Sequence, residues 1–174
     1  MKKRIEISAG GVLLLAALYY FLAADELAAL LLAAAAHELG HIAAIHLTGC
    51  RVSSIRLCAS GAVINRSASL TPAREALCAL SGPAAGALYA VLIAPVFPLS
   101  AGMSLCLSIF NALPALPLDG GRALECLMPR RAVLLCSLIT ASALLMAGLI
   151  FSALGMGTAP ALAGALLLLA QTRL

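Results

Sequence analysis

The chain has 174 residues, of which 63% are hydrophobic and only 10% are charged, and its mean hydropathy is +1.09. A soluble domain of this length needs a charged surface that this composition cannot supply, so an ordinary soluble globular protein is excluded. The 11 basic and 7 acidic side chains leave a net charge of +4. Because every segment has the same apolar character, we expect one membrane-embedded domain covering residues 1–174.

Six apolar stretches that we interpret as membrane spans follow one another along the chain, although some of them are short for a membrane-crossing helix. The predicted spans are residues 7–24, 27–47, 76–97, 99–118, 132–154 and 159–170. The predicted fold class is therefore an all-α polytopic membrane protein with about six transmembrane helices.

The second span contains the sequence His37-Glu38-Leu39-Gly40-His41. Two histidines four residues apart lie on one face of a helix, about one turn apart, so both can reach the same ion. His-Glu-x-x-His on a helix is a zinc site in which the glutamate is a general base. A charge placed in a span costs roughly 2.5 to 3.5 kcal/mol on insertion scales, which favours a functional use over a chance match on a buried helix.

The segment of residues 50–70, between the second and third spans, has a different pattern. Polar and apolar residues alternate loosely in residues 51–57, and β-branched residues return after Ser60 and Gly61. This predicts a small cytoplasmic β-hairpin with its turn near Gly61. The alternative is a basic loop lying on anionic lipid. Thr71 and Pro72 then suit the cap and first position of the next helix.

A zinc site needs a third protein ligand, and the candidates are His46, the acidic residues and six cysteines. His46 lies five residues after His41, which turns it away from the zinc-facing side of the helix, so we interpret it as an interfacial histidine. The cysteines form no Cys-x-x-Cys pair, and most are interpreted as reduced packing residues.

Asp119 is the better candidate for the third ligand. It lies in the sequence NALPALPLDGGR, residues 111–122, where two prolines and two glycines break the helix at the end of the fourth span. Broken backbone at membrane depth is tolerated where it lines a site or cavity. An aspartate can supply an oxygen ligand and leave the fourth position to water. The alternative role of Asp119 is that of a cap or turn residue near Arg122.

The basic residues are distributed unevenly among the predicted spans. They are Lys2, Lys3, Arg4, Arg51, Arg56, Arg66, Arg74, Arg122, Arg130, Arg131 and Arg173. With six spans all of them fall on one side of the membrane, whereas Asp25 and Glu26 lie on an opposite connection. The positive-inside rule therefore predicts a multi-pass membrane protein with both termini in the cytoplasm. The membrane expected for it is a bacterial-type cell membrane.

HELGH in an apolar helix, followed far downstream by NALPALPLDGGR, resembles the site-2 protease family of intramembrane zinc metalloproteases. Within that family the chain is most similar to the branch of stage IV sporulation protein FB. The resemblance covers nearly the whole chain in order and spacing. It implies a six-helix membrane core in which His37, His41 and Asp119 bind one zinc ion per chain and Glu38 is the catalytic base.

Two further features are compared with this family. Ser81-Gly82-Pro83 resembles its small-Gly-Pro motif in the third span, but Gly86 stands where the family often has an asparagine. There is no room for a PDZ domain between the spans and no CBS pair after Leu174, so we expect a minimal catalytic core. Regulation is then expected to come from membrane partners or from substrate presentation.

The resemblance implies hydrolysis of a peptide bond in or next to a transmembrane or membrane-tethered substrate, near the cytoplasmic leaflet. Examples are processing of a sporulation sigma factor and cleavage of an anti-sigma factor or a signal peptide. The expected partners are this substrate and the lipid bilayer, with no nucleic acid. Asn111 is a candidate for binding the substrate backbone or the developing oxyanion through its amide, and its alternative role is a buried amide at a helix interface.

Two other classes of protein remain as alternatives. One is a zinc-binding membrane protein without protease activity, such as a pseudoenzyme scaffold or a metal transporter. A transporter should place polar residues along several spans, whereas the ionisable groups inside the bilayer are almost confined to Glu38, the two histidines and Asp119. The other is a purely structural membrane partner, which should tolerate the loss of Glu38.

Overall fold

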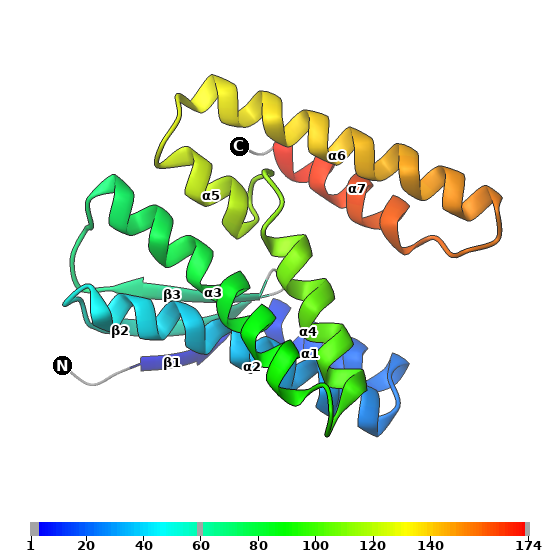
Figure 1. Cartoon of the computed structure of the whole chain (residues 1–174), viewed down its shortest axis with the longest axis horizontal. Coiled ribbons are helices and arrows are strands. Elements are labelled where there is room, and N and C mark those ends of the chain that lie inside the picture. The colour runs from blue at the N-terminus through cyan, green and yellow to red at the C-terminus, as the bar shows by residue number, and fades with distance from the viewer. Residues whose placement is uncertain (1–3, 59–60, 173–174) are drawn as a thin grey trace. The chain divides into compact units, whose positions relative to one another are not determined.

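The computed structural model describes residues 4–58 and 61–172. Strands and helices follow in the order β1, α1, α2, β2, β3, α3, α4, α5, α6, α7 (Figure 1). The chain divides into two compact units, Met1–Ile109 and Phe110–Leu174. Lys2, Lys3 and Arg173, which contribute to the charge-based topology, lie outside the described residues.

Six helices occupy the positions of the six predicted spans. They are α1 (Ala9–Phe21), α2 (Ala24–Leu47), α3 (Pro72–Ile93), α4 (Pro98–Asn111), α6 (Arg130–Ala153) and α7 (Ala159–Gln171). Among the described residues, α2, α3 and α6 are long and apolar enough to cross a membrane, whereas α1, α4 and α7 have only 13 or 14 residues. The mostly helical fold is confirmed and is consistent with a membrane protein, and six complete spans stay a prediction.

The end of the fourth predicted span differs from the expectation. Helix α4 ends at Asn111, seven residues before position 118, because Pro114 and Pro117 cannot continue a helix and disfavour helical backbone in the residues that precede them. After this break a short helix that the spans did not include, α5 (Asp119–Glu125), begins at the predicted ligand.

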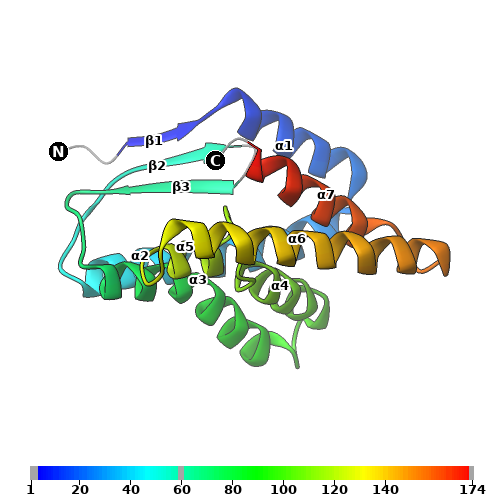
Figure 2. The same ribbon diagram turned by 90° about the horizontal axis from the view of Figure 1, so that it is seen from above.

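A three-stranded sheet belongs to the first unit, with the order β1 (Arg4–Ile7), β2 (Val52–Cys58) and β3 (Gly61–Arg66). Strands β2 and β3 are antiparallel, which confirms the predicted hairpin, although turn residues 59–60 lie outside the described chain. The prediction missed β1, which pairs in parallel with β2 (Figure 2). Arg56 donates to Glu6 on the neighbouring strand at 2.8 Å, and this hydrogen bond raises the pKa of Arg56.

The helices of the first unit are joined by small and hydroxyl side chains. Gly40 of α2 lies against Ser81 and Ala85 of α3, and a Cβ there would overlap both. On α4, buried Ser100 donates to the carbonyl of Ala29 at 3.0 Å, and Ser104 donates to that of Gly86 at 2.9 Å. Small residues and hydroxyl hydrogen bonds are the usual means of close helix packing in membranes.

In the second unit α6 and α7 lie side by side (Figures 1 and 2). Gly148 of α6 meets the backbone of Ala161, and Gly164 of α7 meets the backbone of Leu145. Their small core contains Ala141 and Leu167 together with Ala115 from the segment before α5. The chain that leads to Asp119 is therefore packed on this helix pair.

Candidate metal centre

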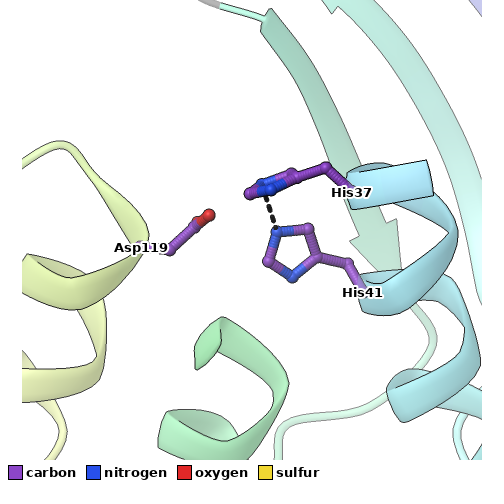
Figure 3. Close-up of side chains that lie close together, drawn as sticks. All are labelled: His37, His41 and Asp119. Carbon is purple, nitrogen blue, oxygen red and sulfur yellow. Dashed lines mark hydrogen bonds between the residues drawn. The ribbon is translucent and has the colours of Figure 1, made fainter. Parts of the chain in front are cut away.

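Helix α2 carries His37, Glu38 and His41 in an uninterrupted run of helix. His37 is buried, with 5% of its surface exposed, and Glu38 and His41 are half-buried. The two imidazoles point toward each other as the i, i+4 spacing predicts, with their Nε2 atoms 3.2 Å apart (Figure 3). The structure thus brings two metal-ligating nitrogens together on one helix.

The separation of these nitrogens fits a shared metal ion. Zinc binds imidazole nitrogen at about 2.0 to 2.1 Å in tetrahedral geometry, which places two such nitrogens about 3.3 Å apart. The 3.2 Å between the Nε2 atoms of His37 and His41 is close to this value. The pair can therefore bind one ion with little rearrangement of either ring.

A backbone carbonyl of α3 orients His41. Its Nδ1 lies 2.8 Å from the carbonyl oxygen of Cys78, which can only accept a hydrogen bond. In a neutral imidazole this puts the proton on Nδ1 and leaves Nε2 with its lone pair available. Histidine ligands of metal sites commonly have such an acceptor on the ring nitrogen opposite the metal. The sequence could not indicate this contact, because it is made by backbone.

Gly82 of α3 leaves the space that the His41 ring occupies. A Cβ at position 82 would overlap Nε2 of His41, the nitrogen that faces His37. The Ser81-Gly82-Pro83 segment therefore has a local physical role, which is to let α3 approach the imidazole closely.

We predict that Gly82→Ala weakens metal binding about 10- to 100-fold, the range typical of changes to groups that orient a ligand. The added methyl displaces His41, while alanine is a better helix former than glycine and preserves α3. Metal titration of the purified protein measures the effect. Gly102→Ala is the matched control, because a Cβ there meets nothing within 4 Å. Equal metal affinity in both variants would contradict this role of Gly82.

Asp119 is the first residue of α5 and is buried, with 7% of its surface exposed. Leu118, not Asp119, holds the N-cap position. The carboxylate lies 3.9 Å from the guanidinium of Arg122, whose side chain is 63% exposed. An ion pair with so long a distance and a largely exposed guanidinium contributes little to stability. Asp119 is therefore not the N-cap of α5, although it lies in the first turn of that helix close to Arg122.

The other singled-out residues are placed as follows. Asn111 is the half-buried last residue of α4. His46 is exposed in the last turn of α2, and its interfacial position stays a prediction. Gly86 is buried, and a Cβ there would overlap the Ser108 hydroxyl. The six cysteines are free thiols.

Two imidazoles and one carboxylate form a donor set that is typical of catalytic zinc. His37 and His41 of the first unit and Asp119 of the second each offer one ligand atom of a kind that binds metal ions. Figure 3 draws these three side chains.

Comparison with known proteins gives a similarity to solved structures. No protein-family model matches the chain, and no curated protein matches its sequence. Among solved structures, the chain is similar to the site-2 protease from Methanocaldococcus jannaschii, with a TM-score of 0.67 and 21% sequence identity. The similarity covers 97% of this chain and 89% of that chain. The chain therefore has the fold of a site-2 protease.

Proposed function

We propose that the protein is an intramembrane zinc metalloprotease. The observation that carries this proposal is the pair of Nε2 atoms 3.2 Å apart on a helix that is long and apolar enough to cross a membrane, with Glu38 beside His37. Such a cluster is costly in a transmembrane segment and indicates a functional site. The similarity of fold to a site-2 protease adds support.

In this proposal His37, His41 and Asp119 bind one zinc ion. Two nitrogens and one oxygen suit zinc better than magnesium or calcium, which prefer oxygen ligands. Three protein ligands also leave a coordination position for water or substrate, as catalysis requires. When bound, zinc supplies a Lewis acid that lowers the pKa of water toward neutrality and polarises the scissile carbonyl.

The residues of the chain perform the proton transfers. The carboxylate of Glu38 accepts a proton from the attacking water and then donates it to the leaving amine. The Cys78 carbonyl holds His41 in the tautomer that binds the metal. Asn111 binds the substrate backbone or the developing oxyanion through its amide. The substrate must unwind locally, because a helix has no free carbonyl to offer.

The proposed substrate is a transmembrane or membrane-tethered protein cleaved near the cytoplasmic leaflet. The HELGH and LDGGR motifs resemble the branch of stage IV sporulation protein FB, so sigma-factor precursors, anti-sigma factors and signal peptides are the classes to test. Regulatory membrane proteins are the further partners proposed.

Removal and return of the metal tests this function. The purified protein, reconstituted in lipid vesicles, is offered one tethered substrate of each class. We expect a chelator to stop cleavage and zinc to restore it. A metal-loaded protein that cleaves none of these substrates would favour a metal-binding membrane protein without protease activity.

We also propose that both termini and residues 50–74 lie in the cytoplasm. The test replaces the six native cysteines by alanine and introduces Asp25→Cys or Ser69→Cys, both at exposed positions. An impermeant maleimide should label Ser69→Cys only from the cytoplasmic side and Asp25→Cys only from the opposite side. Labelling of Asp25→Cys from the cytoplasm would contradict the six-span topology.

A further inference from the structure

Leu116, three residues before Asp119, has both of its backbone polar groups bound by side chains from other helices. Its N–H donates to Oγ of Ser137 on α6 at 2.9 Å. Its carbonyl accepts from Nε2 of Gln171 on α7 at 2.6 Å. Leu116 is 3% exposed and Ser137 is fully buried, so water does not compete for the bond between them, whereas Gln171 is half-buried.

The chemistry of the two side chains fixes the direction of these bonds. The Ser137 hydroxyl donates its one proton to the carbonyl of Val133 at 2.8 Å, so toward Leu116 it acts as an acceptor. Gln171 faces two carbonyls, those of Leu116 and Leu167, so its amide nitrogen must be on that side. Each bond is thus the only arrangement that suits both partners.

The position of Leu116 determines where α5 begins. Leu118 donates to the carbonyl of Ala115 at 2.9 Å, and Arg122 donates to the carbonyl of Leu118 at 2.9 Å. A Cβ at Gly121 would overlap Ala115 and the nitrogen of Leu116, so α5 packs directly on this segment. Only Pro117 and Leu118 separate Leu116 from Asp119. Holding the backbone of Leu116 in place therefore also restricts the position of the Asp119 backbone, from which the carboxylate extends.

We infer that Ser137 and Gln171 are positioning residues for Asp119, which hold the proline-broken segment so that the carboxylate is ready to bind the metal. This inference rests on the proposed role of Asp119 as a ligand. Because Leu116 lies outside a helix, its N–H and carbonyl lack the hydrogen-bond partners that a helix would supply. Burying such backbone groups without hydrogen bonds is costly. Ser137 and Gln171 supply these hydrogen bonds and at the same time attach the segment to α6 and α7.

The test is the metal affinity of the full-length protein in detergent, measured by competition with a chromophoric chelator, so that no protease assay is needed. We expect Ser137→Ala and Gln171→Met each to weaken zinc binding about 10- to 100-fold. Ser104→Ala is the matched control. Its hydroxyl is equally buried and donates to a carbonyl at 2.9 Å, but it lies on α4, outside the segment that carries Asp119.

A double-mutant cycle separates positioning from general destabilisation. If Gln171 acts through Asp119, adding Gln171→Met to Asp119→Ala causes no further loss of affinity beyond about twofold, the usual error of additivity. A further tenfold loss in that background would overturn the inference. Because Gln171 is only half-buried, its variant tests the inference even if Ser137→Ala fails to fold.

The outcomes also separate this inference from the proposed function. Wild-type zinc affinity in Asp119→Ala would remove Asp119 as a ligand and with it the positioning role, while the proposed protease activity would still be judged by the removal and return of the metal. Weakened binding in Asp119→Ala with unchanged binding in Ser137→Ala and Gln171→Met would overturn the positioning role alone.

Discussion

Glu38→Gln is expected to lower the rate of peptide-bond hydrolysis by about 10²- to 10⁴-fold, the range typical for loss of a general base, while zinc remains bound. The amide is nearly isosteric with the carboxylate, so helix α2 should keep its geometry. It cannot accept the proton of the attacking water, and in a site with restricted access to bulk water no other base replaces it. Initial rates on a tethered substrate, together with metal content, measure the effect.

Glu26→Gln is the matched control for this prediction. Glu26 is also half-buried on α2, where its carboxylate accepts a hydrogen bond from the backbone N–H of Ala23 at 2.9 Å. Glutamine can still accept that bond through its amide oxygen, so we expect wild-type activity. If Glu38→Gln with bound zinc cleaves as fast as Glu26→Gln, Glu38 is not the base.

Asp119→Ala is expected to weaken zinc binding by more than about 100-fold, because loss of a ligand should exceed the 10- to 100-fold cost of losing a group that only orients one. Two histidines alone leave the ion with only two protein ligands. Activity should fall in parallel because the site no longer retains the metal. Competition with a chelator and activity at rising zinc concentration measure the two effects.

Asp25→Ala provides the comparison, since Asp25 is exposed in the first turn of α2 and belongs to no proposed site. Its zinc affinity should equal that of the wild type. Indistinguishable affinities for Asp119→Ala and Asp25→Ala would remove Asp119 from the ligand set and leave His46, the cysteines or the other acidic residues to be tested.

The positions of six helices and of the hairpin could be predicted from sequence because hydropathy and strand alternation are local signals. Strand β1 could not be placed in this way. Its pairing joins Arg4 to Ser54 and Ile7 to Leu57, far apart in sequence. The alternation of charged and β-branched residues in Arg4-Ile5-Glu6-Ile7 was a signal for a short strand, but hydropathy assigned its last residue to the first span.

The lengths of the helices could be predicted only in part. Leucine and alanine residues continue past the end of α4, so hydropathy predicts a span that extends to residue 118. The two prolines predict a break in the helix. The start of a new helix at Asp119, however, depends on packing between Gly121 and Ala115, which no local pattern encodes.

The HELGH motif predicted the donor atoms of the candidate site, and the structure places the His37 and His41 rings as the spacing requires. The groups that orient those donors were not predictable. The carbonyl of Cys78 is backbone, and the space left at Gly82 depends on how closely α3 approaches α2. The ligand atoms can thus be inferred from a motif. The groups that orient these atoms become visible only when the packing of the helices is known.

The central claim is most directly tested by cleavage in water enriched in ¹⁸O, with zinc-loaded protein and a tethered substrate in vesicles, followed by mass spectrometry of the products. Hydrolysis places one oxygen atom from water on the new carboxyl group. The expected result is an N-terminal product that carries one ¹⁸O and ends within or next to the transmembrane segment of the substrate, and that is missing with Glu38→Gln. An intact substrate, or the same labelled product in equal yield with Glu38→Gln, would contradict zinc-dependent intramembrane proteolysis by this site.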